Sequence, residues 1–78
     1  MKAILKQALR SAQKNPITIS EDEYHRANDE MQGICLICRD LTNYGVEGDA
    51  EGYTCEQCDN PTIIGTEDCL FYDAITIA

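Results

Sequence analysis

The sequence predicts a small α+β domain with two N-terminal helices, short antiparallel hairpins and a short C-terminal helix. Residues 2–31 contain two segments with helical periodicity, whereas residues 33–65 consist of short extended pieces separated by turn residues. Two C-x-x-C pairs fall within these extended pieces, which indicates that the hairpins share a metal site. A chain of 78 residues without tryptophan forms one domain whose small core needs such additional stabilisation.

The first predicted helix covers residues 2–14 and ends at Asn15-Pro16, because proline disfavours helical geometry at the residue before it. Its apolar face is formed by Ile4, Leu5, Ala8, Leu9 and Ala12. Its opposite face is formed by Lys2, Lys6, Arg10 and Lys14. The helix either packs on the rest of the chain or is an arm that binds a partner, a nucleic acid or, least favoured, an anionic membrane. Self-association through Ile4, Leu5 and Leu9 is a further alternative.

The second predicted helix covers residues 21–31. Ser20 and Glu23 have the spacing of a capping box, and acidic residues occupy the first turn, where the helix dipole favours them. The narrow apolar stripe consists of Tyr24, Ala27 and Met31, and Gly33 is expected to stop the helix. His25, the only histidine, is interpreted as an exposed surface residue.

The remaining chain predicts short strands and one more helix. The strand candidates are residues 33–36, 44–47, 52–55 and 62–64. Gly65 then precedes a short helix with Thr66 as its cap. We expect this helix to turn Cys69, Leu70 and either Phe71 or Tyr72 toward the core. The apolar tail, residues 75–78, is either an edge strand or frayed.

The two cysteine pairs predict a structural zinc site. Cys35, Cys38, Cys55 and Cys58 form two C-x-x-C units separated by sixteen residues, and such units place four thiolates around one Zn²⁺ ion. Iron sites of the rubredoxin type use similar pairs, but they usually have glycine after each second cysteine, where this chain has Arg39 and Asp59. We therefore predict one Zn²⁺ ion in a Cys₄ zinc ribbon. The chain divides into a basic amphipathic helical arm, residues 1–15, and an acidic zinc-ribbon domain, residues 16–78.

Catalysis is not expected from this set of residues. Four cysteine ligands leave no open position on the metal for water or substrate, and no nucleophile lies beside a base. The fifth thiol, Cys69, is interpreted as a core residue. The run of Glu47, Asp49 and Glu51 lacks an EF-hand pattern and is interpreted as a solvated turn. We therefore predict that the protein is not an enzyme.

Charge is distributed unevenly along the chain. There are 14 acidic and 6 basic residues, for a net charge of −8. One Zn²⁺ ion held by four thiolates would bring the charge to about −10. From Asn15 onward only Arg26 and Arg39 are basic, whereas all the acidic residues lie there. Such an acidic body repels phosphate backbones. No secretion signal or membrane-spanning segment is recognisable, and the reduced thiols favour a cytoplasmic location, which would be the host cytoplasm for a phage-encoded protein.

The order of motifs resembles small uncharacterised zinc-ribbon proteins of phages and bacteria, over about residues 33–72. Those proteins have a C-x-x-C-G, a V-E-P-D-A segment, a Y-x-C-x-x-C-G, and a Y-G-x-E that opens a short helix. The matching positions are Cys35, Cys38, Val46, Glu47, Asp49, Ala50, Tyr53, Cys55, Cys58, Gly65 and Glu67. The departures are Arg39 and Asp59 for the two glycines, Gly48 for the proline and Ile64 for the tyrosine. The resemblance implies a zinc ribbon and suggests a phage or other mobile genome, and it implies no activity.

Three functions follow as hypotheses. The first is a protein-binding module whose acidic surface docks on a basic protein surface, for example as a phage-encoded modulator or inhibitor of a host enzyme, transcription complex or defence system. The alternative is a nucleic-acid-binding or transcription-associated zinc ribbon that uses the basic N-terminal helix. The third is a redox sensor in which thiolate oxidation releases zinc.

Overall fold

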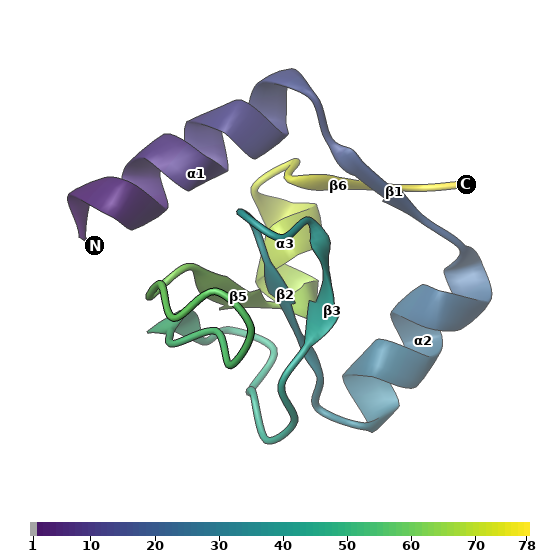
Figure 1. Cartoon of the computed structure of the whole chain (residues 1–78). Helices are drawn as coiled ribbons and strands as arrows, with labels where there is room; N and C mark the ends of the chain where they lie inside the picture. The colour runs from purple at the N-terminus through teal and green to yellow at the C-terminus, as the bar shows by residue number, and fades with distance from the viewer. Residues whose placement is uncertain (1) are drawn as a thin grey trace.

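The computed structural model describes residues 2–78 and confirms the small α+β fold class with short antiparallel strands. Three helices and six strands occur in this range, and every strand is three residues long (Figure 1). In chain order the elements are α1 (Ala3–Lys14), β1 (Ile17–Ile19), α2 (Glu21–Asp29), β2 (Gly33–Cys35), β3 (Asp40–Thr42), β4 (Glu51–Tyr53), β5 (Ile63–Gly65), α3 (Thr66–Phe71) and β6 (Ile75–Ile77).

Four of the strands form an antiparallel sheet in the order β3-β2-β5-β4. The two central strands, β2 and β5, are buried at every position. Because side chains alternate along a strand, the paired Ile34 and Ile64 pack in the main core, whereas the paired Cys35 and Ile63 pack in a second cluster with Cys55. Alternate residues of β2 and β5 therefore contribute to the main hydrophobic core and to the cysteine cluster.

A separate parallel pair joins the segment after α1 to the C-terminal tail. Strand β1 pairs with β6 in the register Ile17 with Ile75 and Ile19 with Ile77, and the two strands lie side by side in Figure 1. Strand β1 was not predicted. For the tail, the structure selects the edge-strand alternative, and Ile75 is buried in the core.

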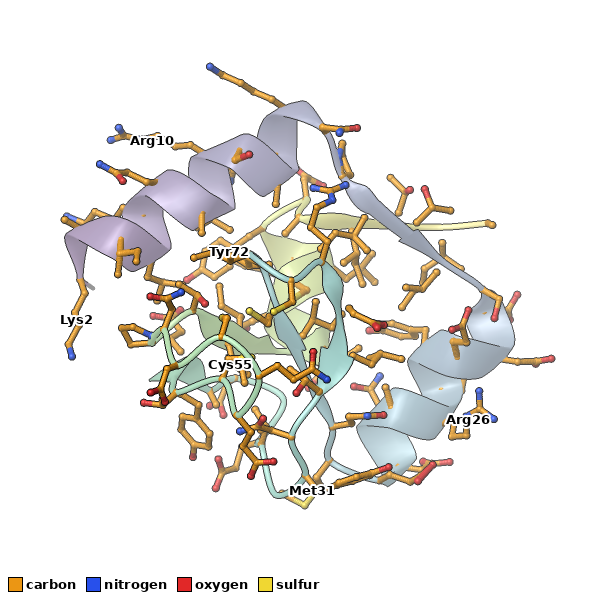
Figure 2. All side chains as sticks on the ribbon, in the orientation of Figure 1. Lys2, Arg10, Arg26, Met31, Cys55 and Tyr72 are labelled. Atoms are coloured by element: carbon orange, nitrogen blue, oxygen red, sulfur yellow. The ribbon has the colours of Figure 1, made fainter. Side chains whose placement is uncertain are left out.

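Helix α1 packs on the rest of the chain. Its buried residues are Leu5, Ala8, Leu9 and Ala12, and they belong to the same core cluster as Ile34 and Ile64. The Gln13 side chain also donates a hydrogen bond to the Tyr72 carbonyl at 2.9 Å. Arg10 points away from the body (Figure 2). Two of the three residues considered for self-association, Leu5 and Leu9, are thus buried within the chain.

Helix α2 has the predicted capping box but ends two residues earlier than predicted. The Ser20 hydroxyl accepts from the Glu23 N–H, and the Glu23 carboxylate accepts from the Ser20 N–H, both at 3.1 Å. The helix ends at Asp29 because Met31 has a left-handed backbone, φ 52°. Met31 is 44% exposed and does not extend the apolar stripe. Gly33 does not stop the helix; it begins β2.

The expected strand at residues 44–47 is wrong. Asn43 and Gly45 have φ values of 54° and 75°, which break an extended backbone, and the strand that pairs with β2 is β3, which was not predicted. The predicted cap of α3 is also wrong, since the Thr66 hydroxyl donates to the Gln32 carbonyl at 2.6 Å. Leu70 and Phe71 are exposed, 37% and 78%, and only Tyr72 of the three candidates packs against the core beside Cys69.

Candidate metal centre

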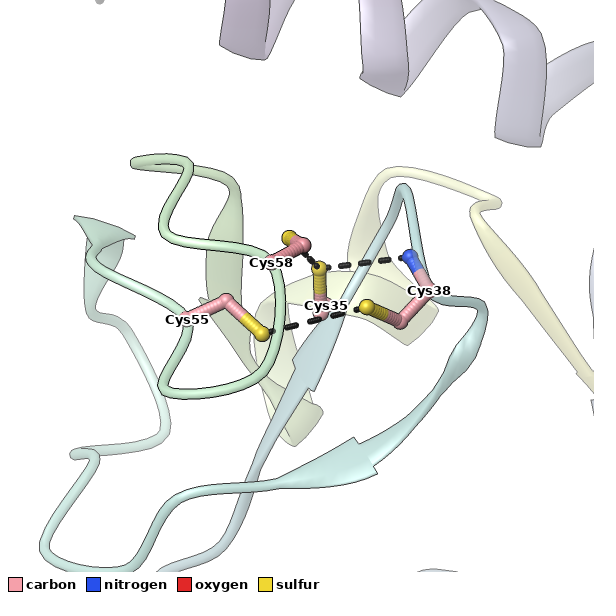
Figure 3. Close-up of side chains that lie close together, drawn as sticks. All are labelled: Cys35, Cys38, Cys55 and Cys58. Atoms are coloured by element: carbon pink, nitrogen blue, oxygen red, sulfur yellow. Dashed lines mark hydrogen bonds between the residues drawn. The ribbon is translucent and has the colours of Figure 1, made fainter.

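The structure brings the four predicted cysteines together from two loops. Cys35 ends β2 and Cys38 lies in the turn that leads to β3, while Cys55 and Cys58 lie in the loop between β4 and β5 (Figure 3). Cys35 and Cys55 are buried, whereas Cys38 and Cys58 are partly exposed. The first cysteine of each C-x-x-C unit is therefore buried in the core, and the second lies nearer the surface.

Both C-x-x-C segments fold into the same tight turn. The N–H groups of Arg39 and Asp59 donate to the carbonyls of Cys35 and Cys55 at 2.8 and 2.9 Å. Arg39 and Asp59 themselves are left-handed, with φ values of 60° and 64°. Glycine adopts this left-handed conformation most easily. Here two non-glycine residues adopt it instead. The turn geometry is thus kept despite both departures from the glycine pattern.

The sulfur positions fit a tetrahedral metal ion. All four Sγ atoms lie within 4.8 Å of one another. The Sγ atoms of Cys35 and Cys58 are 3.7 Å apart, and those of Cys38 and Cys55 are 3.9 Å apart. A metal–sulfur bond of about 2.3 Å implies a sulfur–sulfur separation of about 3.8 Å in a regular tetrahedron. A disulfide would need about 2.05 Å, so these are free thiols at metal-binding spacing.

The surroundings shift the pKa values of two of the thiols in opposite directions. Hydrogen bonds from the Asn60 backbone and side chain lower the pKa of Cys58 to about 6. The hydrogen bond with the Cys58 sulfur, followed by burial, raises the pKa of Cys38 to about 12. Four thiolates this close repel one another, and a divalent cation removes that repulsion. The cluster is therefore chemically suited to a metal ion.

Backbone N–H groups add further support to the sulfurs. The Cys38 N–H donates to the Cys35 sulfur at 3.3 Å, and the Gln57 N–H donates to the Cys55 sulfur at 3.4 Å. The Cys35 sulfur also lies 3.3 Å from the hydroxyl of Thr62, a residue that the sequence analysis did not single out. No spacing rule connects Thr62 to Cys35, because the contact depends on the pairing of β2 with β5.

Two further residues of metal-binding types, Cys69 and His25, do not join the cluster. Cys69 is buried in the main core, where its thiol donates to the Ile64 carbonyl at 3.7 Å, and burial raises its pKa to about 12. His25 lies on the exposed side of α2, 3.5 Å from the Glu21 carboxylate. Both residues are thus placed as predicted.

The acidic run does not form a metal site of its own, but it contributes to a larger acidic surface. We name as the acidic patch Glu47, Asp49, Glu51, Glu67 and Asp68. Burial, and then the neighbouring charges of Glu51, Asp49 and Glu67, raise the pKa of Asp68. The Tyr53 hydroxyl donates to the Glu47 carboxylate, and the Tyr72 hydroxyl donates to the Glu51 carboxylate at 2.5 Å. These two tyrosine contacts were also missed by the sequence analysis.

The backbone holds this patch against the sheet. The Asp68 N–H donates to the Gly48 carbonyl at 3.0 Å, and the Gly65 N–H donates to the Ala50 carbonyl at 2.9 Å. A Cβ atom at Gly65 would lie 2.1 Å from the Glu47 carbonyl oxygen, so only glycine allows this approach. The V-E-x-D-A and G-x-E segments of the sequence thus meet at Gly65.

Comparison of the chain with protein-family models, with curated proteins and with solved structures found no match. The resemblance to phage and bacterial zinc-ribbon proteins stays a prediction. Among residues 2–78, no helix combines the length and the apolar character needed to cross a bilayer.

Proposed function

We propose that the four cysteines hold one structural Zn²⁺ ion and that the protein is not an enzyme. Thiolate ligands at tetrahedral spacing suit zinc, and four of them leave no vacant position for a reacting water or substrate. Metal analysis of protein purified without added metal tests this proposal. One zinc per chain is expected, and a chain that folds equally well after complete metal removal would contradict a structural role.

We further propose that this zinc-stabilised scaffold is a protein-binding module that acts through the acidic patch. The observation that carries the proposal is the arrangement of the patch carboxylates. Tyrosine hydroxyls orient those of Glu47 and Glu51, and no lysine or arginine within residues 2–78 forms an ion pair with any acidic side chain. The carboxylates of Glu47 and Glu51 are therefore held in position without neutralisation.

The electrostatics of the patch favour a cationic partner. Neighbouring negative charges help to raise the pKa of Asp68, so the ionised patch is under repulsion in the free protein. A basic protein surface that docks on the patch would relieve this repulsion and add charge-assisted hydrogen bonds. The phage resemblance makes such a partner a host enzyme, transcription complex or defence protein, with this chain as its modulator or inhibitor.

A specific observation also favours the second candidate, nucleic-acid binding. Helix α1 buries one face in the core, and four exposed basic side chains lie on its other face and at its N-cap. We name as the basic ridge Lys2, Lys6, Arg10 and Lys14. No acidic residue in the described chain forms an ion pair with this ridge. It is thus a fixed positive surface on an acidic protein, and phosphate binding there would weaken steeply with salt.

Affinity capture from host lysate with charge variants separates the two candidates. The patch variant Asp49→Asn/Glu67→Gln and the ridge variant Lys6→Gln/Arg10→Gln each remove two exposed charges. The control is Asp29→Asn/Glu30→Gln, which removes two exposed charges at the end of α2.

The protein-binding proposal expects one stoichiometric protein that survives nuclease treatment and is lost only with the patch variant. Recovery that requires nucleic acid and is lost with the ridge variant would support the second candidate. A partner retained by the patch variant would contradict the acidic-patch proposal.

A further inference from the structure

We propose that Thr62 is a positioning residue of the metal centre, whose hydroxyl donates a hydrogen bond to the Cys35 sulfur. Thr62 is completely buried, and its Oγ1 lies 3.3 Å from the Cys35 Sγ. That sulfur is the one partner that the structure gives this hydroxyl, and no buried side-chain nitrogen or oxygen in residues 2–78 lacks a partner. A buried hydroxyl costs free energy unless it is hydrogen-bonded, so Thr62 at this position depends on Cys35.

Metal binding determines the direction of this hydrogen bond. Between a thiol and a hydroxyl, either group can donate. Once Cys35 binds a metal it is a thiolate without a proton, so only the Thr62 hydroxyl can donate. A hydrogen bond to an ionised acceptor is roughly twice as strong as one between neutral groups. In the metal-bound state the contact is therefore a charge-assisted hydrogen bond with Thr62 as its donor.

The backbone places Thr62 at the junction of the two cysteine turns. Its carbonyl accepts from the Leu36 N–H at 3.1 Å, inside the first C-x-x-C turn. Its N–H donates to the Asn60 carbonyl at 2.9 Å, which also accepts from the Cys55 N–H of the second turn at 2.9 Å. These backbone contacts hold Thr62 in place relative to both halves of the site. A hydroxyl donor at this point keeps the Cys35 sulfur in position relative to the other three sulfurs.

The proposed hydrogen bond has two measurable effects on a bound metal. It stabilises the charge on the metal-bound sulfur, which raises metal affinity. It also withdraws electron density from the sulfur, which raises the energy of thiolate-to-metal charge transfer. Loss of comparable groups that support metal ligands typically costs about 10–100-fold in metal affinity.

The test compares three variants of the full chain. Thr62→Val removes the hydroxyl and nearly preserves shape, while Thr62→Ser keeps the hydroxyl and removes the methyl group. The matched control is Thr66→Val, because Thr66 is equally buried and donates its hydroxyl to the Gln32 carbonyl instead of a sulfur. Zinc affinity is measured by competition with a chelator, and the charge-transfer band is measured with Co²⁺ in place of zinc.

The expected result is a loss of zinc affinity of about 10–100-fold and a red-shifted cobalt band for Thr62→Val, with both properties largely restored in Thr62→Ser. Thr66→Val should destabilise the fold and leave the cobalt band in place. An unshifted band in Thr62→Val, with an affinity loss no greater than that of Thr66→Val, would overturn the inference. The inference rests on the proposed metal site: a wild-type chain that binds neither zinc nor cobalt overturns both, whereas equal binding by wild type and Thr62→Val overturns only the role of Thr62.

The wild-type protein provides a second test if Thr62→Val does not fold. In the chain loaded with ¹¹³Cd²⁺, a hydroxyl proton that bridges Oγ1 and the Cys35 sulfur should exchange slowly and show a scalar coupling to the metal. A protected Thr62 hydroxyl proton without that coupling, or one that exchanges rapidly with water, would contradict the proposed hydrogen bond.

Discussion

Replacing Leu5 by alanine tests whether α1 is an integral part of the core. Leu5 is 2% exposed and packs in the main core cluster with Ile34 and Ile64. Alanine is at least as good a helix former as leucine, so the entire loss of stability should come from packing. Buried leucine-to-alanine changes typically cost about 2–5 kcal/mol.

The surroundings of Leu5 place the expected loss in the lower part of this range. The side chain borders an open pocket of about 430 Å³, which it lines together with Lys2, Glu51, Gly52 and Pro61. Water and neighbouring side chains can enter space that opens to solvent, so the variant does not have to keep an empty cavity. We therefore expect a destabilisation of about 2–3 kcal/mol.

Urea unfolding at a fixed, saturating zinc concentration measures this change, because bound metal contributes to stability. Circular dichroism follows the transition, since the chain has no tryptophan. With a slope of about 1 kcal/mol per molar urea, the midpoint should fall by about 2–3 M. The control is Lys6→Ala, on the exposed face of the same helix. Equal midpoints for the two variants would refute the reasoning and make α1 a detachable arm.

The remaining predictions concern the acidic patch, the metal and Cys69. Gly65→Ala should destabilise the protein by about 1–3 kcal/mol, because the new Cβ would meet the Glu47 carbonyl oxygen at 2.1 Å, and unchanged thermal unfolding would contradict that close approach. Asp68→Asn should stabilise the protein at pH 7. The folded-state pKa of Asp68 is raised, so its carboxylate opposes folding above that pKa, and the gain should vanish as pH falls through it. NMR titration should show the pKa of Asp68 moving toward 3.8 in Glu51→Gln, and an unmoved pKa would exclude Glu51 as a cause. Chelation of the metal should abolish the sheet signal in circular dichroism, whereas Cys69→Ala should retain one metal per chain by metal analysis.

Local sequence rules predicted the cysteine turns and the start of α2 because both depend on residues within a few positions of each other. A C-x-x-C unit closes its own turn, and the Ser20–Glu23 capping box spans one helical turn. Even here the prediction had limits, since the left-handed backbone at Met31 ends α2 before the apolar stripe does. The strand expected at residues 44–47 failed for the same reason, at Asn43 and Gly45.

The sequence alone determined the fold class, the four clustered cysteines and the separation of basic from acidic residues, since each is a matter of residue type and short spacing. Only the tertiary structure decided that α1 packs on its own chain, that β1 pairs with β6, and that Thr62 contacts Cys35. These contacts join residues far apart in the chain, and burial of apolar surface by the whole chain selects among the possible pairings. For this reason no local pattern of residues could have predicted them.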